Sequence, residues 1–463
     1  MINLVQKLIC DKKVLILGFG REGKSTLPVL QQAGTAASIT VADQNPVVDL
    51  PPEVASVTGE GYLGCLNAFD VVFKSPGIVL DKEIGDYQCE IVSQMEIFFR
   101  RFRNQIIGVT GTKGKSTTTT MLYHILKESG RKVLLAGNIG IPVFDILSEV
   151  EEDTAIVLEL SCHQLEYISV SPKRALLLNI YEEHLDHYKT MDRYITAKNN
   201  IYQFQKAGDT LYCLDLLAPS KLQADCVKLV HRMQSTEGAA ESKNSTQQCT
   251  LEKSMANDVN HYVISYKGND FEIPVEEISL IGEHNYFDIA FVYAVCKDFG
   301  MSDEAFGAGL KSYVPLPHRL QFVGKEKGIK WYDDSISTID ETTIQALQTL
   351  PDADTVLIGG LDRGIAYDAL EQYLSTSSVK NIILMEASGK RIAQEIQANM
   401  PDFAQKERIH LTAHLEEAVQ LAAELTRAGH SCVLSPAAAS YGIFKNFEER
   451  GEAFVQYVRQ LGE

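Results

Sequence analysis

The amino-acid sequence predicts an α/β fold built on parallel sheets and divided into three domains. Short apolar runs without polar alternation recur along the chain, as expected of parallel strands covered on both faces. Helical patterns separate these runs, and the alternation starts afresh near Lys13, Ile106 and Lys330. A chain of 463 residues also has the length of roughly two to four domains.

Several apolar runs are expected to form buried strands. In chain order they are residues 13–18, 106–111, 154–161, 175–180, 355–360, 381–386 and 431–437. The three domains are predicted at residues 1–103, 104–313 and 314–463. A short basic link at 100–105 and a segment with two prolines at 314–321 mark the boundaries. The polar segment 234–260 is expected to form surface loops and weak edge strands.

The composition narrows the classes of partner. Lys plus Arg is 43 and Asp plus Glu is 61, so the net charge is −18, which argues against nucleic acid as the main partner. Nucleotides need only a local positive pocket, so they remain possible ligands.

The 9 cysteines show no CxxC pair, as expected of reduced thiols. Neither a signal peptide nor a run of ~18 apolar residues is found, so we expect a cytoplasmic protein without a membrane segment. The lack of heptads favours a monomer.

A glycine-rich loop at residues 108–117 has the features of a nucleotide triphosphate site. It reads GVTGTKGKST and lies between an apolar run and a helical pattern. Backbone N–H groups and the helix dipole favour a phosphate at such a helix start. Lys115 is expected to reach the β- and γ-phosphates, and the hydroxyl of Ser116 or Thr117 to bind Mg²⁺. The alternative is a glycine-rich turn without a ligand.

An earlier loop, GFGREGKST at residues 18–26, matches two patterns at once. It fits the phosphate-loop pattern, and through Gly18, Gly20 and Gly23 it also fits G-x-G-x-x-G. Asp43 ends a second apolar run 20 residues after Gly23, as in dinucleotide-binding folds. The pattern leaves an ATP site, an NAD site and a turn for another nucleotide diphosphate open, and Asp43 could simply end a strand.

More distant residues favour the later loop for ATP. A site that transfers a phosphoryl group needs a carboxylate for Mg²⁺ at the end of a neighbouring strand. Glu159 closes an apolar run after this loop, His184 follows another, and Lys198 lies on a predicted helix. The chain before residue 100 has no comparable set.

The motifs of the chain, taken in order, resemble those of the Mur ligases. They are GVTGTKGKST, GNIG, LELSCHQLE, EEHLDHY, YITAKNNIY, GEHN, PHRLQ, YDDSIST, GGLDRG and LSPAAASYGIFKNFEERG. The resemblance covers nearly the whole chain, and its last motif is typical of the glutamate-adding branch. It implies an N-terminal Rossmann-like domain for the UDP of a sugar substrate, a central P-loop ATPase-like parallel sheet and a C-terminal Rossmann-like domain for the amino acid.

The resemblance also implies a reaction. The expected enzyme is an ATP-dependent carboxylate–amine ligase that adds D-glutamate to UDP-N-acetylmuramoyl-L-alanine in peptidoglycan synthesis, through an acyl phosphate and with release of ADP and phosphate. The family commonly reads D-S-K-[AS]-T where this chain has DSIST, so Ile336 replaces a lysine. Addition of L-glutamate therefore stays open. A folylpolyglutamate-type ligase, an NAD oxidoreductase and a non-enzymatic nucleotide-binding module stay open as well.

The site residues follow from the resemblance, position by position. The catalytic set is Lys115, Glu159, His184 and Lys198. Two Mg²⁺ ions are expected at Ser116, Glu159, His184 and Lys198, with Lys198 carbamylated. The ATP site comprises Gly111, Thr112, Gly114, Lys115, Ser116, Thr117, Asn285, Arg319 and Asp334. The UDP-substrate site comprises Gly18, Phe19, Gly20, Arg21, Asp43, Ser75, Pro76, Gly77, Asn138, Ser161 and Gln164. The glutamate site comprises Thr338, Arg363, Ser440 and Phe444.

Several of these residues also have a plainer interpretation. His184 could be a loop histidine bonded to a backbone group, and Ser161 could cap a helix. Arg319, beside prolines at a boundary, could form a hinge salt bridge. Lys198 could pair with Glu182 or a phosphate. Domain closure is expected because ATP and the amino acid bind different domains.

Overall fold

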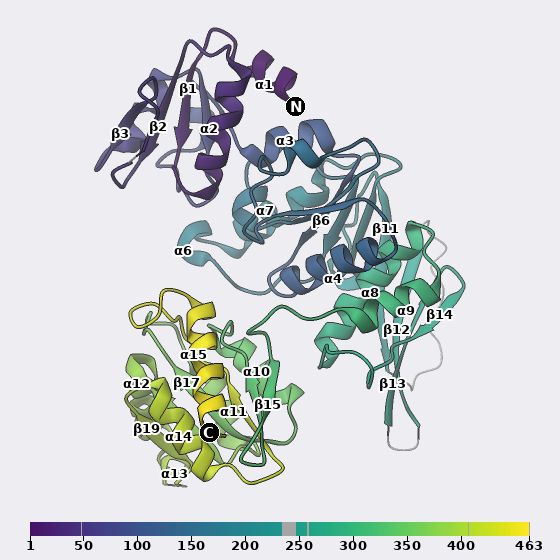
Figure 1. Cartoon of the computed structure of the whole chain (residues 1–463), viewed down its shortest axis with the longest axis vertical. Coiled ribbons are helices and arrows are strands. Elements are labelled where there is room, and N and C mark those ends of the chain that lie inside the picture. The colour runs from purple at the N-terminus through teal and green to yellow at the C-terminus, as the bar shows by residue number, and fades with distance from the viewer. Residues whose placement is uncertain (48, 234–246, 257–258, 406, 463) are drawn as a thin grey trace. The chain divides into compact units, whose positions relative to one another are not determined.

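The structure is a computed structural model of the 463-residue chain and describes all residues except 48, 234–246, 257–258, 406 and 463. The described residues form three β-sheets with flanking helices (Figure 1). By their internal contacts, residues 1–278 and 284–313 form one compact unit, and residues 279–283 and 314–463 form the other. The first unit contains the first two sheets, so the three predicted domains stay a prediction.

The first sheet is parallel, with strand order β3-β2-β1-β4-β5. Its elements are α1 (Ile2–Ile9), β1 (Lys13–Leu17), α2 (Arg21–Ala33), β2 (Ser38–Asp43), β3 (Ala55–Thr58), β4 (Val71–Lys74), β5 (Glu90–Val92) and α3 (Gln94–Phe102). Val14 and Ile16 of β1 enter one hydrophobic core, while Leu15 and Leu17 enter another. A strand buried on both faces explains why this run shows no polar alternation.

The second sheet has nine strands in the order β14-β13-β12-β11-β10-β9-β6-β8-β7. The strands are β6 (Ile106–Thr110), β7 (Val133–Gly137), β8 (Ala155–Glu159), β9 (Arg174–Leu177), β10 (Thr210–Leu214), β11 (Asp225–Met233), β12 (Gln247–Ala256), β13 (Val259–Tyr266) and β14 (Asn269–Glu272). The helices are α4 (Lys115–Glu128), α5 (Cys162–Leu165), α6 (Leu185–Tyr188), α7 (Met191–Gln203), α8 (Glu283–Asp298) and α9 (Asp303–Ser312). From β7 to β12 all neighbours are parallel.

The expectation of loops and weak edge strands at 234–260 is wrong for part of this segment. β12 is an interior strand, paired in parallel with β11 and antiparallel with β13. Its alternate residues Cys249 and Leu251 are buried. Because most other residues of the segment are polar, this short alternation is difficult to recognise in the sequence. Residues 234–246 and 257–258 lie outside the described residues.

The third sheet has the order β15-β16-β20-β17-β18-β19. Its strands are β15 (Gln321–Glu326), β16 (Ile329–Asp333), β17 (Ala353–Gly359), β18 (Asn381–Met385), β19 (Ile409–Thr412) and β20 (Ser431–Leu434). Its helices are α10 (Asp340–Thr349), α11 (Asp368–Thr376), α12 (Glu386–Asn399), α13 (Pro401–Ala404), α14 (Leu415–Leu425) and α15 (Phe447–Gln460). β15 is antiparallel to β16, and the strands from β16 to β19 are parallel to their neighbours.

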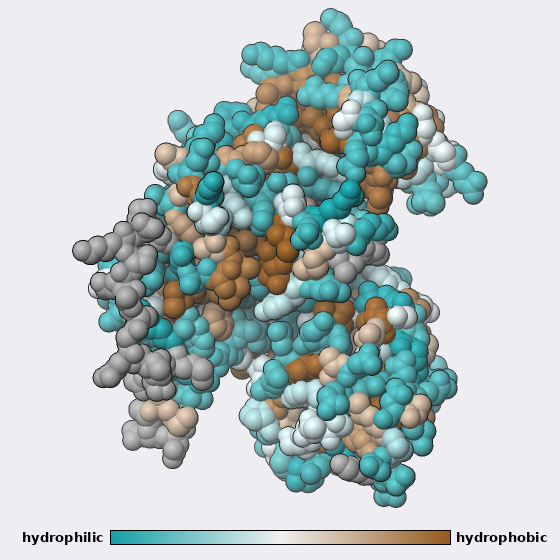
Figure 2. Space-filling view, turned by 180° about the vertical axis from the view of Figure 1, so that it is seen from behind, coloured by the Kyte–Doolittle hydropathy of each residue, from teal (hydrophilic) through white to brown (hydrophobic). Residues whose placement is uncertain are grey.

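The predicted α/β class is confirmed, and each of the predicted buried strands is present. The face drawn in Figure 2 is largely hydrophilic, with smaller hydrophobic areas between the polar side chains. Among the described residues, no helix has both the length and the apolar character that a bilayer crossing requires.

Candidate functional site

The later glycine-rich loop follows β6, which lies between β8 and β9 in the second sheet. Glu159 is the last residue of β8, and His184 follows β9 before α6. The carboxyl ends of these three parallel strands meet at one edge of the sheet. The topology therefore brings the predicted phosphate loop, the predicted carboxylate and the predicted histidine to the same edge.

The loop has the geometry of an anion site at a helix start. Gly114 is the N-cap of α4 with φ 81°, and α4 begins at Lys115. Lys115 Nζ donates to the carbonyl oxygens of Gly111 at 3.0 Å and Thr112 at 2.8 Å. Burial lowers the pKa of Lys115, while Glu159 and Glu183 oppose this shift. Ser116 and Thr117 lie half-buried in the first turn of α4.

Two residues that the motif analysis did not single out hold this loop. Asn179 accepts from the Lys113 backbone N–H at 2.8 Å and donates to the Lys113 carbonyl at 3.0 Å. The Tyr194 hydroxyl lies 3.0 Å from Thr112 Oγ1, so the Thr112 side chain is bonded within the protein. The position of Asn179, just beyond the apolar run of β9, is the one local signal that could have indicated it.

The start of α8 lies beside the loop. A Cβ at Gly114 would lie 2.8 Å from the carboxylate of Asp288, which is itself buried. Asn285 precedes Asp288 by one helical turn and lies on the same face of α8. Asn285, a predicted ATP-site residue, is therefore on the helix that packs against the phosphate loop.

Glu159 is a buried carboxylate that is only half satisfied. It is 2% exposed, and its Oε1 accepts from Asn138 Nδ2 at 2.7 Å. Oε2 is buried and has no hydrogen-bond partner among the described residues. A buried, unpartnered carboxylate oxygen is costly unless a ligand fills the position, and carboxylate oxygen is what Mg²⁺ prefers. The predicted metal role of Glu159 fits this geometry.

Lys198 reaches the same loop from α7. It is 1% exposed, and its Nζ donates to the Gly111 carbonyl at 2.7 Å. Burial, together with the nearby Lys115, lowers the pKa of Lys198 to about 7. Glu182, the alternative partner suggested for Lys198, is exposed. The Lys198 amine is instead buried and bonds to the glycine-rich loop.

His184 lies at the outer side of this edge. Its side chain is 42% exposed, and its Nε2 is 3.8 Å from Glu183 Oε2. Its φ of 59° places it in the left-handed region, which a non-glycine residue adopts rarely. Its ring centroid is 5.0 Å from that of His163 and 6.2 Å from that of Tyr194.

The earlier loop is built differently from a phosphate loop. Gly18 has φ 88°, and a Cβ at Gly23 would lie 2.1 Å from the Gly18 carbonyl oxygen. Lys24 is exposed, and Ser25 Oγ donates to Asp145 Oδ1 at 2.5 Å. The glycines thus allow a close approach of helix and strand, which is their role in dinucleotide-type turns.

The remaining predicted residues of this loop hold it in shape. Asp43 Oδ2 accepts from the Phe19 N–H at 2.7 Å, and Ser75 Oγ donates to the Gly18 carbonyl at 2.9 Å. Gly20 is the N-cap of α2. Asp43 therefore does more than end a strand.

A pocket of about 260 Å³ lies between the earlier loop and the second sheet. Its lining includes many of the residues predicted to bind the UDP substrate. These are Arg21, Pro76, Gly77, Asn138, Ser161 and Gln164. Asn138 lines this pocket and also bonds to Glu159, so the pocket and the phosphate-loop edge share one side chain.

Ser161 occupies a position that is compatible with both interpretations of the sequence. It is the N-cap of α5, where it forms a capping box with Gln164, and it lines the pocket as well.

Gln164 Nε2 donates to Glu22 Oε1 at 2.8 Å, and burial raises the pKa of Glu22. Lys74 is a further buried cation beside this region, and burial lowers its pKa to about 8. Sequence reasoning missed both Glu22 and Lys74, although Lys74 ends an apolar strand.

In the second unit, the predicted glutamate-binding residues come from adjacent strand ends. The strands β16, β20 and β17 are neighbours, and their following loops carry Thr338, Ser440 and Arg363. Arg363 Nη2 donates to the Thr338 carbonyl at 2.9 Å. The Phe444 N–H donates to the Ser440 carbonyl at 3.1 Å. Arg363 is exposed, so a ligand at this edge can reach its guanidinium.

Asp334 and Arg319 have partners within this unit. Asp334 is buried, accepts from the Leu320 N–H at 3.1 Å and from Ser435 Oγ at 2.8 Å, and has its pKa raised to about 7 by burial. The Arg319 guanidinium lies 6.0 Å from the ring centroid of Phe447. The side chain of Asp334 therefore helps to fix the DSIST segment.

Arg450 is a buried cation that the sequence analysis did not select. It is 1% exposed, and it donates to the Ser335 side chain at 3.0 Å and to the Ala438 carbonyl at 3.0 Å. Its Nη1 is buried without a hydrogen-bond partner among the described residues. It joins the segment that contains Ile336 to the loop that contains Ser440.

Comparison with known proteins agrees with this arrangement. Family models match at two places, the Mur ligase middle domain at residues 109–296 and the Mur ligase glutamate ligase domain at 318–438. Proteins named UDP-N-acetylmuramoylalanine–D-glutamate ligase are similar over full length. The one from Acetivibrio thermocellus is 32% identical and the one from Clostridium acetobutylicum 33%, each with 99% of both chains covered.

Solved structures show the same fold at lower identity. MurF ligase from Thermotoga maritima, determined in complex with ADP, has a TM-score of 0.58 at 18% identity and covers 99% of this chain and 100% of that one. UDP-N-acetylmuramate–alanine ligase MurC from the same organism has a TM-score of 0.57 at 17% identity, covering 97% and 99%. With full-length relatives above 30% identity, the chain belongs to the Mur ligase family of ATP-dependent ligases.

Proposed function

We propose that this enzyme adds D-glutamate to UDP-N-acetylmuramoyl-L-alanine with ATP, in the synthesis of peptidoglycan. The single observation that carries the proposal is the side chain of Asn138. It lines the pocket beside the earlier loop and bonds to Glu159 at the phosphate-loop edge. The acyl carboxylate of a substrate held in that pocket would lie beside the γ-phosphate of ATP.

The phosphate-loop residues position ATP. The N-terminus of α4 offers backbone N–H groups to the phosphates, and Lys115 exchanges its bonds to Gly111 and Thr112 for phosphate oxygens. The substrate carboxylate attacks the γ-phosphorus and ADP leaves. The amine of glutamate then attacks the carbonyl of the acyl phosphate, loses a proton, and phosphate leaves. Positioning and charge neutralisation are the main contributions of the protein.

Two Mg²⁺ ions complete the proposed site. Ser116 and Glu159 would hold one ion, and His184 with a carbamylated Lys198 would hold the other. Bound there, the ions would supply positive charge to neutralise the phosphates. The Glu159 oxygen without a partner supports the first position. A pKa of about 7 leaves much of the Lys198 amine neutral near physiological pH, the form that combines with CO₂, and the neutral fraction rises with pH. A carbamate supplies the oxygen ligands that Mg²⁺ prefers.

The glutamate site is proposed at the strand ends of the second unit. Arg363 and Thr338 take one carboxylate, since guanidinium is a bidentate donor. Ser440 and the loop before Phe444 take the other. Ile336 cannot replace the lysine that the family commonly has, and Arg450, whose buried Nη1 lacks a partner among the described residues, supplies positive charge to the same segment. The cytoplasmic location and the monomeric state stay predictions.

A ligand screen separates this function from the competing ones. Isothermal titration calorimetry with UDP-N-acetylmuramoyl-L-alanine, NAD and a folate, each added to the full-length enzyme, is expected to give binding for the UDP-sugar alone. Asn138→Leu removes the amide that joins the pocket to Glu159 and should weaken that binding, whereas Asn67→Leu, outside the pocket, should not. Tight NAD or folate binding without UDP-sugar binding would overturn the proposal.

A further inference from the structure

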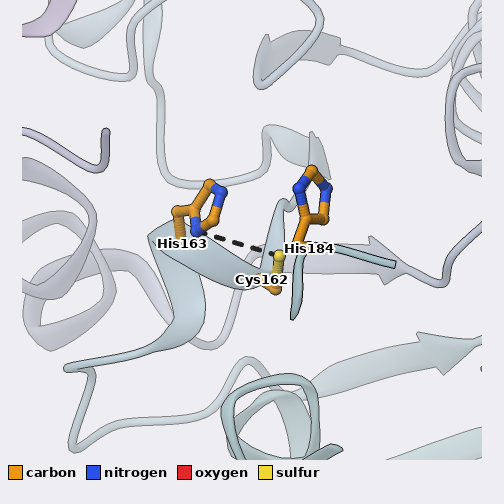
Figure 3. A group of neighbouring side chains, drawn as sticks. All are labelled: Cys162, His163 and His184. Carbon is orange, nitrogen blue, oxygen red and sulfur yellow. Dashed lines mark hydrogen bonds between the residues drawn. The ribbon is translucent and has the colours of Figure 1, made fainter. Parts of the chain in front are cut away.

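Three side chains that can bind a transition metal lie close together at the outer side of the phosphate-loop edge of the second sheet. Cys162 and His163 are consecutive residues of α5, and His184 precedes α6. Their ligand atoms all lie within 4.8 Å of one another, and Cys162 Sγ is 4.0 Å from His163 Nδ1. Figure 3 shows the sulfur and the two imidazole rings converging from two segments of the chain.

We propose that Cys162, His163 and His184 form a binding site for Zn²⁺ that shares His184 with the proposed magnesium site. A thiolate with two imidazoles is a donor set that favours zinc, whereas Mg²⁺ prefers oxygen ligands. Zinc binds sulfur at about 2.3 Å and nitrogen at about 2.0 Å, so its ligand atoms lie roughly 3.5 Å apart. The three ligand atoms would therefore have to move closer together on binding, and the His184 side chain, which is 42% exposed, has room to move.

The surroundings suit a three-ligand site with one open position. Cys162 is buried, His163 is half-buried and His184 is exposed, so an ion would reach the cluster from the solvent side. The Tyr188 hydroxyl lies 3.1 Å from His163 Nδ1, so an ion bound at this nitrogen would displace that hydrogen bond. On binding, the Cys162 thiol forms a sulfur–zinc bond and releases its proton to the solvent.

A second group of three possible ligands shares His163 with the first and is the alternative metal site that the experiment must exclude. His163, Glu166 and His187 also place their ligand atoms within 4.8 Å of one another. His187 Nε2 is already 3.1 Å from Glu166 Oε2, so an ion there would have to break this pair. This triad contains no sulfur, which makes the two sites distinguishable by spectroscopy.

Cobalt is the probe, because Co²⁺ bound to a thiolate has a near-ultraviolet charge-transfer band. The reduced full-length enzyme, titrated with Co²⁺, is expected to develop this band at one equivalent and to lose it when Zn²⁺ is added. Cys162→Ser should abolish the band, and His163→Gln should weaken cobalt binding at least about tenfold. His187→Gln and Cys226→Ser should both retain the charge-transfer band. Cys226→Ser is a control for thiols elsewhere in the chain, because Cys226 Sγ lies 3.8 Å from Cys213 Sγ.

Each remaining result overturns the assignment. A wild-type enzyme without the band, a Cys162→Ser variant that keeps it, or a Cys226→Ser variant that loses it would exclude this site. Loss of cobalt binding in His187→Gln would place the ion at the second triad. Unchanged circular dichroism and thermal unfolding show that each variant is folded.

The site has a consequence that rests on the proposed function. His184 cannot serve Mg²⁺ while it binds zinc, so micromolar Zn²⁺ should inhibit ligation despite excess Mg²⁺. Cys162→Ser should be at least about tenfold less sensitive to zinc. Equal sensitivity of the two enzymes would overturn this competition. An enzyme without ligase activity would instead contradict the proposed function and leave the cobalt result standing.

Discussion

At the scale of one residue, the surroundings of Glu159 support its proposed role as a metal ligand. Its carboxylate ends a buried strand, and only one of its oxygens has a partner among the described residues. Such an arrangement is unfavourable in an empty site and becomes favourable when a cation binds. Function, rather than stability, explains a carboxylate at this position.

Substitution Glu159→Gln tests this interpretation. The amide has the same shape and can still accept from Asn138, but it lacks the charge that attracts Mg²⁺. We expect ligation at low Mg²⁺ to fall about 100-fold and to recover partly at high Mg²⁺, with no loss of thermal stability. Initial rates over a Mg²⁺ series, with thermal unfolding as the control, measure both effects. An unchanged Mg²⁺ dependence would speak against a metal role.

Lys198→Ala tests the carbamate. The variant should lose most of its ligase activity, and short carboxylic acids such as acetate should restore part of it by supplying the missing oxygens. Lys113→Ala is the matched control, because Lys113 pairs with Glu183 at the same loop and no acid should rescue it. Carbon-13 NMR in labelled bicarbonate should show one carbamate signal, absent in Lys198→Ala. An enzyme with neither signal nor rescue would contradict the modification.

At the scale of elements, we propose separate tasks for the two loops that end in Gly-Lys-Ser-Thr. Lys115 is half-buried at the start of α4 and bonds to loop carbonyls, whereas Lys24 is exposed on α2. Lys115→Ala should abolish detectable ATP binding, and Lys24→Ala should leave the Kd for ATP within about twofold. Calorimetry with a non-hydrolysable ATP analogue measures both constants. A large loss of ATP affinity in Lys24→Ala would place the nucleotide at the earlier loop.

The close packing of α2 on β1 gives a second test at this scale. A Cβ at Gly23 would lie 2.1 Å from the Gly18 carbonyl oxygen, whereas a Cβ at Gly20 meets no atom within 4 Å. Gly23→Ala should therefore lower the free energy of unfolding by about 1–3 kcal/mol and raise the KM for the UDP-sugar. Gly20→Ala should leave the free energy of unfolding unchanged. Equal stabilities of the two variants in chemical denaturation would show that the turn is not tight.

The sequence predicted local elements better than their long-range partners. Lys115, Glu159 and Lys198 were identified because each lies in a short motif or ends a recognisable strand. Arg450 was missed because its partner Ser335 lies 115 residues away, and Glu22 because Gln164 lies 142 residues away. Neither pairing leaves a local pattern. β12 was underestimated because a polar composition concealed a strand buried on alternate residues.

At the scale of the whole molecule, three α/β domains were predicted, and the described residues form three sheets. Runs without polar alternation correctly indicated parallel strands, since consecutive side chains of β17 such as Val356 and Leu357 enter different cores. The roles of individual side chains could not be read in the same way. Ser161 both caps a helix and lines the pocket, so one residue supports two interpretations.

The most direct test of the proposed reaction is a ligation assay with each pure enantiomer of glutamate. The wild-type enzyme is given UDP-N-acetylmuramoyl-L-alanine, ATP, Mg²⁺ and equal concentrations of D- or L-glutamate, and phosphate release and the coupled product are measured together. We expect product and stoichiometric phosphate with D-glutamate. Product from L-glutamate alone would contradict the assignment of D-glutamate, and product from neither enantiomer would contradict glutamate ligation itself.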